Sequence, residues 1–320
     1  MAHELEILEN GRASMAYAGE VPWHGLGTKV PHDLTPVQML EAADLNWTVR
    51  KVPLFADIAG KQVQTGAEAL VRDTDDKILT IVTDNWNPVQ NLEAFEFFND
   101  FIAAGDMEMH TAGSLKDGRM VWALAKLKDS FELFGGDTVD GYMLFSNPHQ
   151  FGRSIDVRFT PTRVVCNNTL TLALESNSKN RVSVNHRSVF DGDAVKQTLG
   201  IASDKLAKYK EMAAFLGSKR YNGENVVEYF NRVFPVTSNR KIDIDKQSRA
   251  AIRATSVLDT QPGAEYAEGT WWQAFNAVTY LTDHVLGRAP ETRMQSAWFG
   301  VNQQRKVQAL NLAVEMAEAA

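Results

Sequence analysis

The side chains best suited to chemistry form a basic stretch in the middle of the chain. Between His149 and Arg187 there are six arginine or lysine residues and two acidic residues, a net charge of +4, although the chain of 320 residues carries −7. The cations are Arg153, Arg158, Arg163, Lys179, Arg181 and Arg187. Such residues contact nucleic-acid phosphates, so the stretch predicts a phosphate-binding groove. The alternative is a solvated strand and loop whose arginines pair with acids elsewhere.

Small polar residues and aromatic rings accompany these cations. The polar residues are Asn177, Ser178, Asn180 and Asn185, and they are interleaved with the later cations. The nearby aromatic residues are Tyr142, Phe145, Phe151 and Phe159. Aromatic rings beside a basic groove stack on the bases of single strands, and we select Tyr142 and Phe151 as the candidates for this role.

The other polar residues form no recognisable catalytic, metal or cofactor motif. The segment from Gly25 to Lys29 contains two glycines but lacks the spacing of a phosphate loop. The seven histidines include no pair four residues apart, and a single cysteine cannot build a cysteine-rich metal site. We therefore expect no cofactor and favour a binding protein over an enzyme. A hydrolase whose site forms only on folding, from distant carboxylates and His110, His149 or His186, stays open.

The single cysteine, Cys166, is open to two interpretations. It could be a nucleophile that works with a distant histidine, or a small buried residue beside Val164 and Val165. We predict the buried, structural role. Because one cysteine cannot form an intrachain disulfide, the composition indicates a reducing compartment. No signal peptide and no run of about 18 apolar residues is visible, so the predicted location is the cytoplasm.

The elements that would position the basic stretch are mostly strands. Residues 1–46 read as an irregular lead-in with one short helix, from about Thr35 to Leu45. Residues 47–190 read as a β-rich core, interrupted by one helix from Leu92 to Ala103. In the strand from Arg153 to Thr160, apolar and polar residues alternate, which predicts one buried face and one face turned to solvent or ligand.

The remainder, residues 191–320, reads as helical, and it could pack on the core as part of one domain. The helix that starts at Trp271 has two tryptophans and Phe275, which predicts a core-packing helix or a subunit interface. The predicted fold class is therefore α+β, with an antiparallel β-rich N-terminal half, a crossing helix and a mainly helical C-terminal half.

Three motifs resemble a known family. They are Trp23-His24-Gly25-Leu26-Gly27, then Thr162-Arg163-Val164-Val165-Cys166-Asn167-Asn168-Thr169-Leu170, and Phe275-Asn276-Ala277-Val278-Thr279 with Asp283-His284. They are similar to the phage and plasmid proteins grouped as domain of unknown function 932. The resemblance implies a mobile-element protein, acting in the host cytoplasm if it is encoded by a phage. It implies no activity and no catalytic residue.

The basic stretch and the strand-then-helix order favour a nucleic-acid-binding protein, with single-stranded DNA as the expected partner. This order resembles that of phage single-strand annealing proteins, which act in recombination, hold a strand by its backbone and need no nucleotide cofactor. By the same resemblance we expect a homo-oligomer larger than a dimer. The lack of a long apolar run leads us to expect no membrane partner. The alternative function is a counter-defence or regulatory protein that binds a host protein through an exposed apolar or acidic patch.

Overall fold

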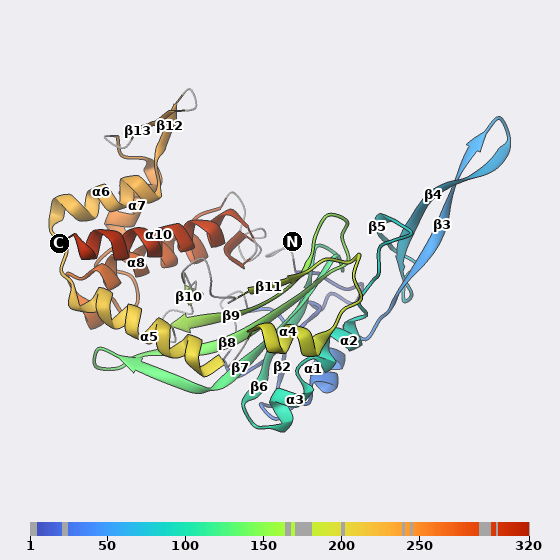
Figure 1. The fold of residues 1–320 in the computed structure, drawn as a ribbon, viewed down its shortest axis with the longest axis horizontal. Coiled ribbons are helices and arrows are strands. Elements are labelled where there is room, and N and C mark those ends of the chain that lie inside the picture. Colours follow the sequence, from blue (N-terminus) through green and yellow to red (C-terminus); the bar gives the residue numbers. More distant parts are fainter. Residues whose placement is uncertain are drawn as a thin grey trace. The chain divides into compact units, whose positions relative to one another are not determined.

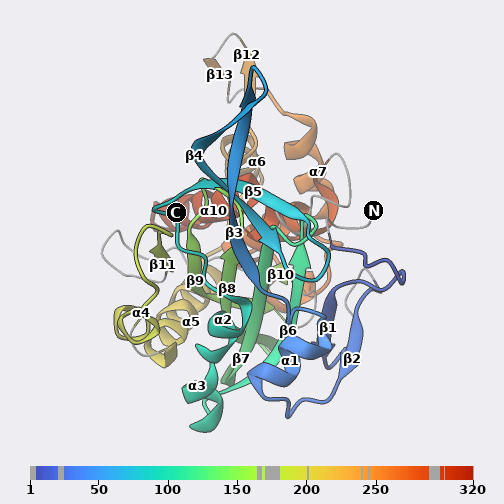
Figure 2. The same cartoon turned by 90° about the vertical axis from the view of Figure 1, so that its right-hand side faces the viewer.

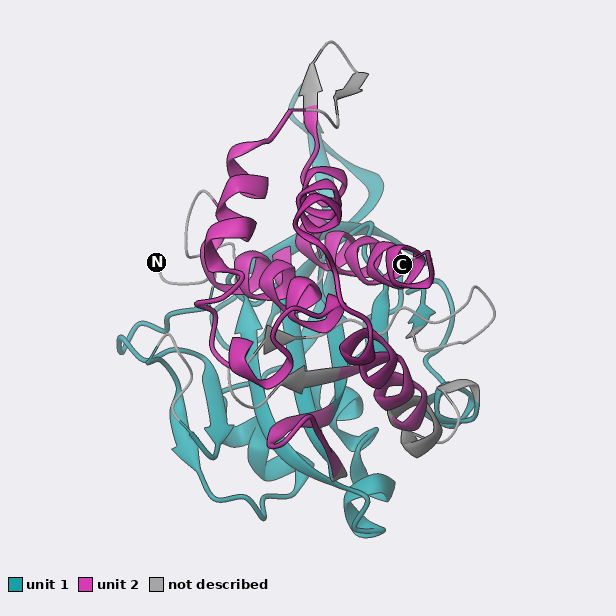
Figure 3. Ribbon diagram, turned by 90° about the vertical axis from the view of Figure 1, so that its left-hand side faces the viewer, with its two compact units in different colours: residues 1–128, 142–158, 181–200 teal, residues 129–141, 159–180, 201–320 magenta. Residues whose placement is uncertain are grey.

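The computed structural model divides the chain into two compact units, which Figure 3 colours separately. Unit 1 comprises Met1–Lys128, Tyr142–Arg158 and Arg181–Gly200, and unit 2 comprises Asp129–Gly141, Phe159–Asn180 and Ile201–Ala320. The structure describes residues 5–20, 25–163, 168–169, 181–199, 202–238, 241–243, 246–287, 296–298 and 300–319. Each unit is built from segments that alternate along the chain.

The largest sheet has the strand order β10-β9-β8-β7-β6-β1-β2, with β11 also paired to β9. Its strands are β1 (Met15–Ala18), β2 (Thr28–Val30), β6 (Met107–Leu115), β7 (Met120–Leu133), β8 (Asp137–Pro148), β9 (Ile155–Arg163), β10 (Asn168–Thr169) and β11 (Arg181–Val184). The pairs β1–β6, β6–β7, β9–β10 and β9–β11 are antiparallel, whereas β1 and β2 are parallel. Asp117-Gly118, a dipeptide that favours hairpin turns, lies in the connection between β6 and β7.

A second, three-stranded antiparallel sheet belongs wholly to unit 1. It is formed by β3 (Val49–Ile58), β4 (Lys61–Arg72) and β5 (Ile78–Thr83), in the order β3-β4-β5. The turn-rich residues 73–76 connect β4 to β5, as the sequence predicts, and Val71 pairs with Ile78 beside that turn. Figure 1 shows that the far end of the β3–β4 hairpin extends beyond the rest of unit 1.

The helices of unit 1 begin with α1 (Pro36–Ala42), where Thr35 and Gln38 form a capping box. The single helix expected from Leu92 to Ala103 is divided into α2 (Asn91–Glu96) and α3 (Asn99–Ala103). The division lies at Phe97 and Phe98, which are adjacent and both buried. The last helix of this unit is α4 (Gly192–Leu199).

Two short strands, β1 and β2, lie in the lead-in in addition to the expected helix. All four residues of β1 are buried, so this strand lacks the alternation of apolar and polar residues that marks a half-buried strand. Figure 2 shows β1 and β2 beside β6.

Unit 2 is mainly helical, which confirms the predicted α+β class together with the antiparallel sheets. Its helical elements are α5 (Ala202–Ser218), α6 (Gly223–Val233), α7 (Arg249–Val257), the 3-10 helix η2 (Ala264–Ala267), α8 (Trp271–Tyr280), the π-helix η3 (Leu281–Val285) and α10 (Val301–Glu318). A small antiparallel hairpin, β12 (Val236–Ser238) with β13 (Lys241–Asp243), lies between α6 and α7.

Helix α8 is the centre of the unit 2 core. Every residue from Trp271 to Thr279 is buried, and the side chain of Thr270 caps the helix by accepting a hydrogen bond from the backbone N–H of Gln273. The indole of Trp272 donates to Asp137, at 3.1 Å. The predicted core-packing role of this helix is therefore confirmed. None of the helices in the described part of the chain has both the length and the apolar character of a bilayer-spanning segment.

Gly217 near the end of α5 provides a test of packing in unit 2. A Cβ atom at this position would collide with the ring of Phe134, so Gly217→Ala must displace that ring. In an exposed helix this substitution stabilises by about 1 kcal/mol. Here we expect a net loss of about 1–2 kcal/mol in the free energy of unfolding, because overpacking outweighs helix propensity.

The measurement is chemical denaturation, with Gly223→Ala in α6 as the control. A Cβ at Gly223 meets nothing within 4 Å, so the control variant should be no less stable than the wild type. A Gly217→Ala protein as stable as its control would contradict the close approach of Phe134.

Candidate functional site

Antiparallel pairing brings separated parts of the basic stretch together in unit 1. Arg158 of β9 lies opposite Arg181 of β11, and Ile155 lies opposite Val184. Because Arg153 precedes Ile155 and Arg187 follows Val184, these two arginines flank the same end of the strand pair. Both residues are exposed. Residues up to 34 positions apart in the sequence therefore lie on or beside one pair of neighbouring strands.

Arg158 differs from the two exposed arginines. Its side chain is 11% exposed, and its Nε lies 2.9 Å from the buried carboxylate of Asp156. The expectation that this face of the strand meets solvent or ligand is therefore wrong at Asp156 and Arg158, since β9 is buried on both faces from Ile155 to Phe159. Two opposite charges at i and i+2 share one face of a strand, which explains how the pair is accommodated in the interior.

The remaining predicted cations are only partly placed. The backbone of Arg163 pairs with Asn168, and that of Arg181 with Arg158, whereas the side chains of Arg163 and Arg181 lie outside the described structure. Lys179 and Cys166 lie outside the described residues altogether.

The two candidate stacking rings have different surroundings. Phe151 is 54% exposed, and its backbone N–H donates to the hydroxyl of Thr80 at 3.3 Å. Tyr142 is buried, and its ring meets that of His110 edge-on at 5.1 Å. Of the two, Phe151 offers a ring face to solvent.

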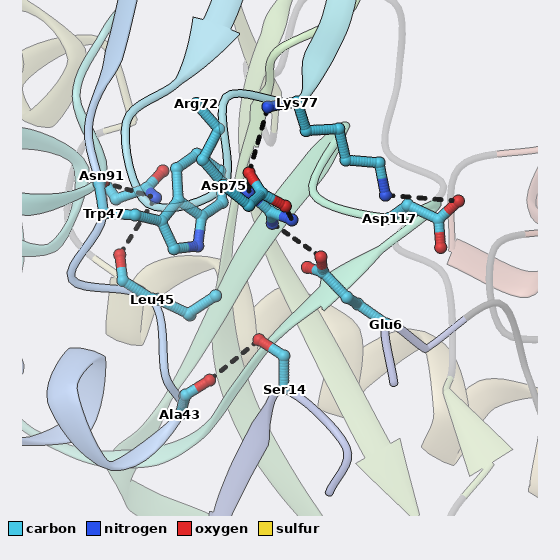
Figure 4. Close-up of polar contacts among 10 residues, drawn as sticks. All are labelled: Glu6, Ser14, Ala43, Leu45, Trp47, Arg72, Asp75, Lys77, Asn91 and Asp117. Atoms are coloured by element: carbon cyan, nitrogen blue, oxygen red, sulfur yellow. Dashed lines mark hydrogen bonds and ion pairs between the residues drawn. The ribbon is translucent and has the colours of Figure 1, made fainter. Parts of the chain in front are cut away.

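A buried ionic network, which the sequence did not predict, lies around Arg72 at the end of β4 (Figure 4). Its guanidinium donates to Glu6 at 2.6 Å and makes two hydrogen bonds with Asp75, at 2.9 and 2.6 Å. The guanidinium carbon also lies 5.2 Å from the ring centre of Trp47. Asp75 follows directly in the turn, but Glu6 is 66 residues away, and no local pattern indicates that contact.

The charges of this network stabilise one another. Burial alone would lower the pKa of Arg72, but hydrogen bonds and charges from Asp75 and Glu6 outweigh burial and raise it. The pKa of Asp75 is lowered, chiefly by its hydrogen bond from Arg72. Arg72 therefore stays charged and links the N-terminal segment to the β4–β5 turn.

Next to this network lie two buried histidines. The amide of Asn91 donates to the carbonyls of Leu45 and Trp47, and its oxygen lies 2.8 Å from Nε2 of His149. His149 is fully buried, and its ring lies 5.2 Å from that of Trp47. Desolvation, followed by the charges of His186 and Arg72, lowers its pKa to about 3.

His186 stacks on Trp86 at 4.1 Å, and its Nδ1 lies 3.0 Å from the carbonyl of Asn87. Desolvation lowers its pKa as well, partly opposed by hydrogen bonds with the carbonyls of Asn87 and Pro148. Both imidazoles are thus neutral near pH 7 and act as packing and hydrogen-bonding groups. His110, by contrast, contacts Thr111 at 2.7 Å, apart from this pair. Among the described residues, no group of three or more histidine, cysteine, aspartate or glutamate side chains is arranged to hold a metal ion.

The model of the family described as domain of unknown function 932 (DUF932) matches residues 78–308, more than half of the chain. The chain belongs to this family. The DUF932 region begins at the first residue of β5 and ends within α10, so it includes all six predicted cations and excludes β3, β4 and Arg72. Neither the curated proteins nor the solved structures include a match to this DUF932 protein.

The Arg72 network predicts a large effect of a conservative change. Arg72→Lys keeps the charge but cannot make the two parallel hydrogen bonds to Asp75 while also reaching Glu6. We expect the free energy of unfolding to fall by roughly 2–4 kcal/mol, because a carboxylate is left buried without its partner. Denaturant titration measures this loss. Arg50→Lys is the matched control, since Arg50 pairs with Asp76 on the surface and the change should cost little.

The buried histidines predict a loss of stability in mild acid. A pKa below the unfolded value of about 6.5 means that the unfolded chain binds protons first, so stability falls as pH drops below about 6.5. For His149 alone, the loss between pH 7.5 and 5.5 is about 1.4 kcal/mol. His149→Gln should remove this share of the pH dependence, measured by denaturation at both pH values.

His32→Gln is the control for this experiment, because it removes an imidazole that is 59% exposed instead of a buried one. Equal pH dependence in the wild type and in His149→Gln would show that His149 is accessible to protons in the folded protein.

Proposed function

We propose that this protein binds single-stranded nucleic acid, with single-stranded DNA as the preferred partner, through phosphate contacts at one end of the β9–β11 strand pair. The observation that supports this function is the register that sets Arg181 opposite Arg158 and leaves Arg153 and Arg187 exposed at one end of the pair. Four cations from two distant segments thereby share one strand pair in a chain whose net charge is −7. A local basic site of this kind attracts a phosphate backbone despite an acidic total charge.

The residues divide this task between them. Arg153 and Arg187 contact phosphates, since both are exposed. Arg158 forms a buried ion pair with Asp156 and stabilises the strand pair. Phe151 lies two residues before Arg153 and stacks on a base. Arg163, Lys179 and Arg181 are further candidates for phosphate contacts.

Within this class, we assign the protein to single-strand annealing or recombination in a phage or plasmid. Annealing requires a protein that holds a strand by its backbone and leaves the base edges accessible. Contacts from arginines and one stacking ring meet this requirement, and they need no nucleotide cofactor. Annealing also benefits from several copies that act along one strand, in keeping with a homo-oligomer.

The test is binding of a labelled single-stranded oligonucleotide at several salt concentrations. Each phosphate contact contributes about −0.7 to the slope of log affinity against log salt. Arg153→Ala with Arg187→Ala should flatten this slope by about 1.4 and weaken all sequences alike. Phe151→Ala should cost about 1–3 kcal/mol of binding free energy.

The control is Arg12→Ala with Arg50→Ala, which removes the same charge from two exposed arginines elsewhere in unit 1. This variant should retain the salt slope of the wild type. If the wild type fails to bind even at ~50 mM salt, where screening is weak, the proposal fails and the alternative of a host-protein binder replaces it.

A further inference from the structure

The end of the β3–β4 hairpin, residues 54–66, is a ribbon of two strands that we call the β arm. All residues from Asp57 to Gly66 are exposed, so both faces of the arm are open to solvent within the described structure. In Figures 1 and 2 the arm extends past the other elements of unit 1. The arm precedes residue 78, so it is an addition to the part of the chain that matches the family.

A β-bulge separates the arm from the root of its sheet. The register shifts between Pro53 and Phe55, and Gly66 has a φ of +74° at this point. The hydroxyl of Thr65 donates to the carbonyl of Leu54 across the bulge, at 2.9 Å. Strand β5 pairs with β4 only from Ala67 onward, so it covers the root and leaves the arm with two strands.

Although the arm is exposed, it carries several large apolar side chains. Phe55, Ile58 and Val63 are 55%, 58% and 45% exposed. Ala56 pairs with Val63, and Ile58 pairs with Lys61, so Ala56, Ile58 and Val63 share one face with Lys61, whereas Phe55 lies on the opposite face. Ile78 and Ile81 of β5 are also exposed, which places half of the ten exposed large apolar residues among those described on this one small sheet.

An isolated two-stranded ribbon is marginally stable in water, and exposed apolar residues gathered in one place indicate an interaction surface. The edges of the arm are poorly suited to adding a strand, because Pro53 and the bulge interrupt β3 and β4 at the root. The faces of the arm are therefore the surface that a partner would cover.

We propose that the partner is a second copy of this chain, and that two β arms pack face to face through Ala56, Ile58 and Val63. The arm contains one acidic and one basic residue, Asp57 and Lys61, so it has no net charge to attract a nucleic acid or a strongly charged protein. Two whole chains of charge −7 repel each other, and this repulsion is smallest where neutral arms meet away from the acidic bodies. The face is apolar except for Lys61 beside the turn, whose aliphatic stem can pack while its ammonium group stays in water at the tip.

Face-to-face packing about a two-fold axis gives a closed dimer, since the same surface is used on both subunits. The larger homo-oligomer expected from the sequence would need a second contact surface in addition. This inference does not depend on nucleic-acid binding, because the arm and the β9–β11 strand pair share no residue.

The test is the mass in solution at micromolar concentration, measured by light scattering. The wild type should have at least twice the chain mass. Ile58→Asp with Val63→Asp should raise the dissociation constant by at least ~10-fold, because each arm brings two carboxylates into the contact, and the four in the dimer outnumber the two Lys61 ammonium groups there. Val189→Asp is the control, since Val189 is 82% exposed in unit 1 outside the arm, and it should assemble as the wild type does.

Cross-linking of the unmodified protein provides an independent test that no folding defect can affect. An amine-reactive cross-linker should join Lys61 of one copy to Lys61 of another, and such a peptide can arise only between two chains. A monomeric wild type would overturn the proposal, and would leave the arm available to a host protein. An oligomer without the Lys61–Lys61 link, whose mass is unchanged by the double substitution, would overturn it equally.

Discussion

Unit 1 depends on the ion pairs of Arg72 with Glu6 and Asp75. A buried guanidinium is costly unless its donors are satisfied, and here two carboxylates and the ring of Trp47 surround it. The arrangement fixes three parts of the chain at one point: the N-terminal segment, the start of β3 and the β4–β5 turn. The root of the three-stranded sheet is thereby held firmly, which allows its far end to extend as an arm.

The buried histidine His149 is likewise part of a set of hydrogen bonds that joins separate parts of unit 1. Asn91 begins helix α2, and its amide joins two carbonyls of the preceding chain to the ring of His149. One side chain thus connects the helix, the entry to β3 and the end of β8. Unit 2 combines its apolar core with a buried ion pair as well: Lys306 donates to Asp283 at 2.7 Å, while helix α8 is buried from Trp271 to Thr279. Each unit therefore relies on both polar and apolar contacts in its interior.

The sequence predicted those features that are encoded locally. The turn of residues 73–76, the start of a short helix at Thr35 and the fold class all follow from sequence patterns. The contacts of Arg72 with Glu6 and of Trp272 with Asp137 join residues 66 and 135 positions apart, and they leave no local pattern. In the candidate site, charge counting found the arginines, but it could not distinguish the buried Arg158 from the exposed Arg153. That difference depends on which elements cover β9.

The alternation of the two units along the chain also determines when each can form during synthesis. Phe131, Leu133 and Val139, at the β7–β8 connection, belong to the core of unit 2, yet the helices that bury them all come after residue 201. At about 5–20 residues per second, these apolar residues wait on the order of ten seconds for their partners to leave the ribosome. The order of translation thus makes unit 1 the first unit that can fold, and it leaves this hairpin end as the surface most in need of a chaperone.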